Sequence, residues 1–156
     1  MKVNVFLCDE QTVPVDLALI RHLADTILER EGYPPDTEIT VMLVTDDDIT
    51  RYNERFLDRA GPTDVLAFPL ESLQPGEVPD RSPSDPPINL GDVIISPDYV
   101  RRQAMDNGSE FGDEMALMVV HGVLHLMGWD HADDEQAEEM EAHERSLLGT
   151  VGVTRP

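Results

Sequence analysis

Apolar residues recur along this chain with two different periods, and together these predict a mixture of strands and helices. Four short segments rich in apolar and β-branched residues are predicted to be strands: residues 2–7, 38–44, 64–68 and 88–95. Five segments are predicted to be helices: residues 15–31, 45–57, 97–108, 111–127 and 133–148. The two kinds of element do not alternate strictly, and the last third of the chain is helical. The pattern predicts an α+β fold, with a small mixed sheet of about four strands covered by helices.

Turn residues and prolines mark the boundaries of these elements. Thr45 stands three residues before Asp48, which resembles the capping box that starts a helix. Ser96 precedes a proline that suits the first helical position. Residues 71–87 contain five prolines and are predicted to form a loop, either a lid or a simple insertion, of which we favour the insertion. Residues 150–156 are predicted to fray.

The strongest chemical signal lies in the predicted helix 111–127 and the turn after it. The segment reads His-Gly-Val-Leu-His-Leu-Met-Gly-Trp-Asp-His and holds three of the chain's five histidines. His121 and His125 share one helix face, with Cβ atoms roughly 5–6 Å apart. Gly128 can end the helix and turn the chain back, so that His131 arrives as a third ligand. Three imidazoles with an open fourth position are typical of a catalytic site, so we predict one Zn²⁺ per chain.

A buried helix that merely carries core histidines is the alternative. The residues around His121 and His125 are apolar on nearly every face, which is typical of a buried helix. Two buried imidazoles without partners would destabilise the protein, whereas one metal ion would satisfy both. The apolar surroundings therefore favour the metal site.

The same spacing also matches the metzincin protease pattern HExxHxxGxxH in all but one position. The glutamate that acts there as the general base is replaced by Gly122, which cannot accept a proton. Glycine costs a helix roughly 1 kcal/mol relative to alanine, so we expect Gly122 to permit a close approach of backbone or ligand. A zinc peptidase is the first alternative function. A non-catalytic zinc domain is the second, although structural sites normally show four ligands.

Charge is the most unusual feature of the composition. Asp and Glu number 32 against 11 Lys and Arg, which gives a net charge of −21, and Lys2 is the only lysine. Such a surface is strongly solvated and suits high salt, where self-repulsion is screened. It argues against a nuclease, because phosphate binding normally uses a basic surface. Binding of nucleic acid would need a local basic groove, a divalent ion or a partner surface.

At 156 residues, the chain is long enough for residues 1–156 to form one domain with its own core. It contains no run of about 18 apolar residues, so no membrane span is predicted. Its first residues lack the apolar core of a signal peptide. Cys8 is the only cysteine, which excludes an internal disulfide and fits a reducing cytoplasm. Because Cys8 lies in an apolar run, we expect it to be a small core residue.

Three motifs in order along the chain resemble the YbeY family, the metal-dependent endoribonucleases of bacterial ribosomal RNA maturation. The histidine segment 121–131 is one of them. The family's Pro-Thr-(Asp/Asn)-Val-Leu-Ser-Phe-Pro is matched by residues 62–69, with Ala67 where serine is usual. Its Gly-Asp-(Ile/Val)-x-Ile-Ser is matched by residues 91–96. The resemblance covers most of the chain.

This resemblance implies a zincin-like α+β fold with one zinc on His121, His125 and His131. It implies cleavage of single-stranded RNA during 16S rRNA 3′-end maturation and ribosome quality control. The implied partners are an rRNA precursor, the small ribosomal subunit and ribosome-assembly proteins in the cytoplasm, and we expect the chain to be a monomer. Action on the assembling ribosome would offset the repulsion between this acidic protein and RNA, because other proteins would position the RNA.

One position departs from the family pattern. The family usually places a catalytic arginine five residues before the motif's proline, and that position is Leu57 here. Arg55 and Arg59 flank it, and a nearby cation would stabilise the charge that develops on a phosphate. We favour Arg59, because it lies on the loop side and can bend toward the site. The alternative is that both arginines are merely solvated residues at a helix end.

The remaining polar and aromatic residues of this region receive weaker assignments. Asp130 either orients a ligand imidazole or caps the turn. Trp129 is expected to pack rather than to stack on a base. His22 and His143 are expected at the surface or at helix ends.

Overall fold

The computed structural model describes residues 4–156 of the chain. Four strands run over β1 (Val5–Asp9), β2 (Glu38–Leu43), β3 (Val65–Pro69) and β4 (Asn89–Ile95). Five helices run over α1 (Leu17–Arg30), α2 (Asp46–Leu57), α3 (Pro97–Asn107), α4 (Phe111–Leu126) and α5 (Asp134–Gly149). The predicted α+β composition is confirmed, with boundaries shifted by a few residues at most. The start of the strand expected at 2–7 lies outside the described residues.

The strands form one mixed sheet in the order β1-β2-β4-β3. β1 pairs with β2 and β2 with β4 in parallel, whereas β3 pairs with β4 in the antiparallel direction. The small mixed sheet expected from the sequence is therefore confirmed. β3 lies at one edge of this sheet, beside the helix that carries the histidines.

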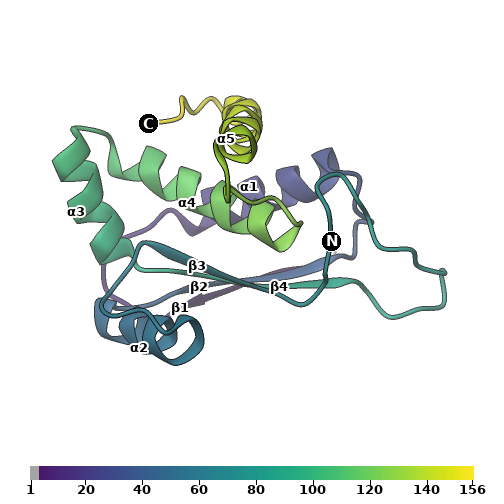
Figure 1. Ribbon diagram of the computed structural model, residues 1–156, viewed down its shortest axis with the longest axis horizontal. Coiled ribbons are helices and arrows are strands. Elements are labelled where there is room, and N and C mark those ends of the chain that lie inside the picture. Colours follow the sequence, from purple (N-terminus) through teal and green to yellow (C-terminus); the bar gives the residue numbers. More distant parts are fainter. Residues whose placement is uncertain (1–3) are drawn as a thin grey trace.

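Helices cover both faces of the sheet. Figure 1 shows α1, α4 and α5 on one side of the strands and α2 on the other. Successive side chains of a strand point to opposite faces. On β4, Val93 and Ile95 belong to the large core under α1 and α4, whereas Ile94 belongs to a smaller cluster under α2. No helix in residues 4–156 is both long and apolar enough to cross a bilayer.

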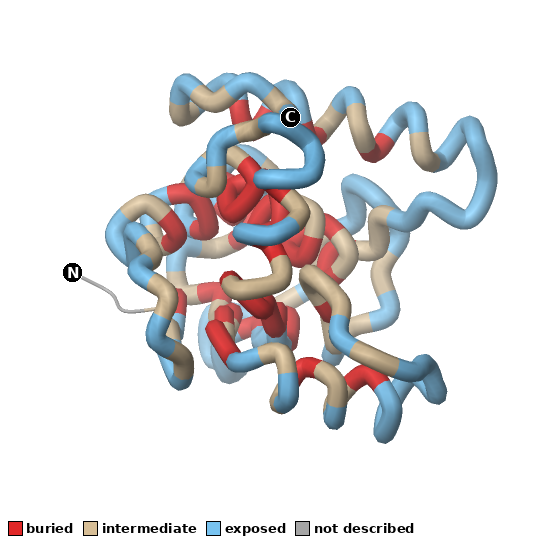
Figure 2. The backbone as a smooth tube through the Cα atoms, turned by 90° about the vertical axis from the view of Figure 1, so that its left-hand side faces the viewer, coloured by how far each residue is buried: buried red, intermediate tan, exposed pale blue. Residues whose placement is uncertain are grey.

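Helix α4 lies at the centre of the fold, among the buried segments of Figure 2. It contacts α1, α3 and α5 as well as β3 and β4. Gly122 lets it approach the sheet closely, because a Cβ atom there would lie 2.5 Å from Val93 Cγ1. The close approach expected at Gly122 is thus present, and the neighbour is the sheet.

The two expected helix starts differ in detail. Thr45 Oγ1 accepts a hydrogen bond from the Asp48 amide at 3.2 Å, which confirms the predicted cap. Ser96 precedes α3 as expected, but its hydroxyl makes no capping bond. It donates to Asp46 Oδ1 at 2.7 Å instead and so ties α3 to the start of α2.

The proline-rich loop 71–87 contains neither helix nor strand and is held at several points. Arg81 binds the Asp36 carboxylate through two hydrogen bonds of 2.6 and 2.7 Å. Its start packs on the turn after α4, because a Cβ at Gly128 would lie 2.2 Å from the Leu73 carbonyl oxygen. The loop therefore supports the turn that carries His131.

Two expectations about the ends of the chain were wrong. Cys8 is exposed, because Val5 and Leu7 pack on the α1 face and the cluster under α2 does not reach β1. The segment 150–156 was expected to fray, but Val151 and Val153 pack against the main core. Apolar side chains at alternate positions hold this segment in place.

Candidate metal centre and its cavity

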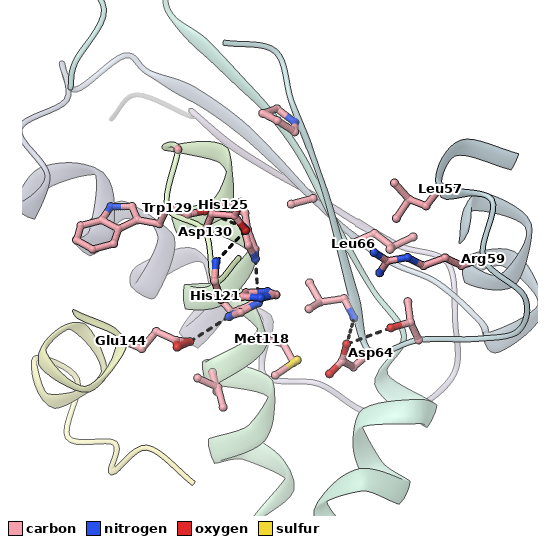
Figure 3. A pocket seen from close by; sticks show the side chains of 18 of the residues that line it. Leu57, Arg59, Asp64, Leu66, Met118, His121, His125, Trp129, Asp130 and Glu144 are labelled. Carbon is pink, nitrogen blue, oxygen red and sulfur yellow. Dashed lines mark hydrogen bonds and ion pairs between the residues drawn. The ribbon is translucent and has the colours of Figure 1, made fainter. Parts of the chain in front are cut away.

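His121 and His125 project from the same face of α4 (Figure 3). His131 follows in the loop before α5. The Nε2 atoms of His121 and His125 lie 3.0 Å apart. One nitrogen from each of the three rings lies within 4.8 Å of the others. The structure thus brings together the three histidines singled out in the sequence, and they form a candidate metal site.

In His121 and His125, a hydrogen bond at Nδ1, away from the facing Nε2 atoms, determines which ring nitrogen carries the proton. His125 Nδ1 lies 2.8 Å from the Trp129 carbonyl oxygen, which can only accept, so Nδ1 is the donor. His121 Nδ1 lies 3.2 Å from Glu144 Oε2 and donates to this carboxylate. Both Nε2 atoms are then left as acceptors that face each other, an arrangement that a cation between them would stabilise.

The ligand geometry fits a small cation of zinc type. In a tetrahedral site with bonds of about 2.0–2.1 Å, two ligand nitrogens lie roughly 3.3 Å apart. The separation of 3.0 Å between His121 and His125 Nε2 is close to this value. Burial, followed by the neighbouring His121 and His131, lowers the pKa of His125 and favours its neutral, ligating form.

The turn after α4 brings His131 to the other two histidines. Gly128 adopts a φ of +96°, which a glycine adopts readily, and the Trp129 amide donates to the Leu124 carbonyl at 3.0 Å. Asp130 Oδ1 accepts the amide N–H of His131 at 2.8 Å. Asp130 therefore caps the turn, and the ring-orienting contacts come from Glu144 and the Trp129 carbonyl.

The histidines line one side of a cavity of about 640 Å³. The other side comes from the end of α2, the loop after it and β3, with Leu57, Arg59, Asp64 and Leu66 among its residues (Figure 3). Arg55 points elsewhere and places its guanidinium carbon 5.3 Å from the Phe56 ring centre. Of the two candidate arginines, only Arg59 lines the cavity of the histidines.

Trp129, His143 and His22 are the other aromatic or histidine residues considered in the sequence, and they lie outside the three-histidine cluster. Trp129 stacks on His143, with ring centres 4.4 Å apart and planes 10° from parallel, so its packing role is confirmed. His143 also pairs with Glu31 and is half-buried, whereas it was expected at the surface or a helix end. His22 is exposed on α1, as expected.

Glu144 is a residue of the site that could have been found in the sequence but was missed. It lies on α5 and is buried, with 2% of its side chain exposed. A signal was present in the sequence, because Glu144 stands four residues after Met140 and three before Leu147, on the apolar stripe of its helix. A carboxylate on a buried stripe needs a partner, and here His121 supplies one.

Comparisons with known proteins agree with this geometry. A family model described as Endoribonuclease YbeY matches residues 7–152. An Endoribonuclease YbeY of Acidothermus cellulolyticus is 38% identical over 146 residues, covering 93% of this chain and 89% of that protein. One of Beutenbergia cavernae is 38% identical over 142 residues, covering 91% and 93%.

A solved structure also resembles the fold. The solution structure of TM1509 from Thermotoga maritima matches with a TM-score of 0.58 and 26% identity, covering 94% of this chain and 91% of that one. The family match spans nearly the whole sequence and includes all three histidines. This chain therefore belongs to the endoribonuclease YbeY family and is a hydrolase whose substrate is RNA.

Proposed function

We propose that this endoribonuclease binds one zinc ion on His121, His125 and His131 and cuts single-stranded RNA in the adjoining cavity. The observation that carries the proposal is the pair of Nε2 atoms at 3.0 Å, each with its ring proton held on the opposite nitrogen. When bound there, zinc would polarise a phosphoryl oxygen and make water a better nucleophile.

The chain's own residues would prepare this site and complete it. Glu144 and the Trp129 carbonyl keep the Nδ1 protons of His121 and His125 in place, which orients both rings toward the cavity. Arg59 lines the opposite side, where its guanidinium would stabilise negative charge on the phosphate. Because guanidinium stays protonated at neutral pH, Arg59 would act as a fixed charge and not as an acid or base.

The position of Gly122 disfavours the peptidase alternative. In the protease pattern, the residue after the first histidine is the general base, but here this position faces the sheet. A Cβ at Gly122 would lie 2.5 Å from Val93 Cγ1 and 3.3 Å from Val65 Cγ2, so a longer side chain has no room. The same close packing leaves the three histidines without the carboxylate that peptide hydrolysis uses.

The proposed biological substrate is precursor 16S rRNA, cut during 3′-end maturation and ribosome quality control in the cytoplasm. The net charge of −21 supports a substrate presented by others, because a free RNA chain would be repelled from most of this surface. We propose that the small ribosomal subunit and its assembly proteins position the RNA, with the protein acting as a monomer.

RNA and peptide cleavage, each measured with and without a chelator, test the proposal. We expect chelator-sensitive cleavage of single-stranded RNA and no cleavage of a peptide library. His125→Ala should lose nearly all bound zinc and RNA cleavage. His22→Ala, which removes an exposed histidine from α1, should change neither. Full zinc occupancy in both His121→Ala and His125→Ala would refute the ligand assignment, and chelator-sensitive peptide cleavage would favour the peptidase.

A further inference from the structure

The C-terminal segment brings a second arginine to the cavity. Beyond α5, half-buried and exposed residues alternate, and Val151, Val153 and Arg155 are the half-buried ones. Val151 and Val153 pack against the main core, and Arg155, next in the alternation, lines the cavity together with Glu144. Arg155 thus lines the cavity on the side of Glu144 and α5. Arg59 lines it from the loop after α2, as Figure 3 shows.

The Arg155 guanidinium lies near two carboxylates without a normal hydrogen bond to either. Its Nε is 3.7 Å from Glu144 Oε1, and its Nη2 is 3.8 Å from Glu141 Oε1. Both distances exceed the range of about 2.7–3.2 Å for an N–H···O bond. Within the described chain, the buried Nε has no hydrogen-bond partner, and Nη1 donates a long hydrogen bond of 3.4 Å to the Pro156 carbonyl oxygen.

This arrangement differs from that of a structural ion pair in the same molecule. Arg81 binds the Asp36 carboxylate through two bonds of 2.6 and 2.7 Å, the fork geometry that arginine prefers. Arg155 keeps its charge at the cavity and forms no two-bond pair with a carboxylate among the described residues. About a quarter of its side chain is exposed, 24%, so a ligand in the cavity can reach it.

An RNA phosphate is the ligand that fits these donors. A guanidinium presents several N–H groups in a plane that matches two oxygens of a phosphate. The protein has few cations, with 11 Lys and Arg against 32 acidic residues, and two of its arginines line this one cavity. The family match ends at residue 152, so Arg155 lies outside the matched segment.

We propose that Arg155 binds a phosphate of the RNA substrate from the α5 side of the cavity, across from Arg59. The proposal rests on the proposed function, in which this cavity takes single-stranded RNA. Arg155 then fixes the strand in the cavity by a charged contact. Removing this contact should weaken RNA binding while the histidine site stays intact.

The test compares wild type with Arg155→Met and Arg155→Lys, and uses Arg145→Met as the matched control. Arg145 pairs with the same Glu141, at 3.6 Å, but it does not line the cavity. Affinity for a fluorescent single-stranded oligoribonucleotide of mixed sequence is measured in chelator at several salt concentrations. The KM for RNA cleavage, the zinc affinity and the melting temperature are measured separately.

We expect Arg155→Met to weaken RNA binding roughly tenfold, the effect of losing one hydrogen bond between charged groups. The slope of log K against log salt should fall by about 0.7, the value for one phosphate contact on a single strand. Arg155→Lys should keep this slope and recover part of the affinity. Arg145→Met should match wild type in both quantities.

Three results would overturn the inference while leaving the proposed function intact. The first is equal RNA affinity in wild type and Arg155→Met. The second is an equal loss in Arg155→Met and Arg145→Met, which would show an effect of bulk charge. The third is lower zinc affinity or melting temperature in Arg155→Met with unchanged RNA affinity. This would show that Arg155 only helps to hold Glu144 in place and does not bind RNA. A wild-type protein that neither binds nor cleaves RNA would overturn the proposed function and this inference together.

Discussion

At the scale of single residues, the backbone fixes Arg59 beside the cavity although the family's arginine position holds Leu57. Asn53, buried in α2, accepts the Arg59 amide on its carbonyl at 3.2 Å. The Asn53 side chain donates to the Gly61 carbonyl at 3.0 Å. Asp58 adopts the left-handed conformation between them, with a φ of 52°. The loop that carries Arg59 is therefore held at both ends. The Arg59 side chain lines the cavity although it stands two residues after Leu57.

Arg59→Ala should slow RNA cleavage by about 10²–10³, the effect of losing one interaction that stabilises the transition state. Zinc content should stay unchanged, because within residues 4–156 the ring hydrogen bonds of His121 and His125 do not involve Arg59. Single-turnover cleavage measures the rate. Arg55→Ala is the matched control, since Arg55 lies against Phe56 and outside this cavity. Unchanged cleavage in Arg59→Ala, together with a sharp rise in Leu57→Arg, would show that Arg59 does not compensate.

Glu144→Gln should weaken zinc binding by about 10–100-fold, the usual effect of losing a carboxylate behind a ligating histidine. Glutamine keeps the size of the side chain but removes the charge that holds the proton on His121 Nδ1. Competition with a zinc-binding dye gives the affinity. Glu141→Gln, on the same helix and 44% exposed, should bind zinc like wild type. Equal zinc affinity in all three proteins would exclude a role for Glu144 at the metal site.

At the scale of elements, the site depends on how closely α4 packs on the sheet. Gly122 lies between His121 and His125, the two α4 histidines of the candidate metal site, and faces Val93 of β4. The missing side chain lets the helix approach the strands, and this places the histidines beside β3 at the edge of the sheet. Gly122 thus contributes to the candidate metal site through packing.

Gly122→Ala should destabilise the fold by about 1–3 kcal/mol, the usual cost of an added group in a well-packed core. The new Cβ would lie 2.5 Å from Val93 Cγ1, so α4 or Val93 must move. Chemical denaturation measures the free energy of unfolding. Gly112→Ala is the control, because a Cβ there meets nothing within 4 Å and alanine favours a helix. Because the new Cβ would meet Val93, Val93→Ala should relieve part of the cost of Gly122→Ala. Fully additive effects of the two substitutions would show that this contact is not the cause.

The elements and the three histidines could be predicted because both depend on local spacing. A helix fixes the relation of His121 to His125, and one glycine turn suffices to bring His131 back. Glu144 could not be placed in this way. Its contact with His121 joins residues 23 positions apart and depends on how α5 lies against α4.

Other misses have the same origin in long-range packing. The apolar run around Cys8 gave no information about which face of β1 a helix would cover. The alternation of Val151, Val153 and Arg155 was too short to separate a packed segment from a frayed one. Val151 and Val153 pack against the main core, and this packing brings Arg155 to the cavity.

At the scale of the whole molecule, the chain carries a large excess of negative charge, while Arg59 and Arg155 line the cavity. The acidic side chains, with a net charge of −21, repel one another more strongly in the compact fold than in the expanded, unfolded chain. Salt screens this repulsion, and the Debye length falls from about 10 Å at 0.1 M to about 3 Å at 1 M. The same screening weakens attraction between RNA phosphates and the arginines of the cavity. Stability and substrate binding should therefore respond to salt in opposite directions.

Raising NaCl from about 0.1 M to about 1 M should increase the free energy of unfolding by about 1 kcal/mol or more, which is roughly 2–4 °C in Tm. Over the same range, affinity for single-stranded RNA should fall. Denaturation and binding titrations in one salt series measure both. A variant with Glu135, Glu138 and Glu139 of α5 changed to glutamine should gain less stability from salt, because these exposed carboxylates contribute to the repulsion. Stability that stays flat or falls with salt would show that self-repulsion does not limit this fold, and the acidic surface would then need another physical explanation.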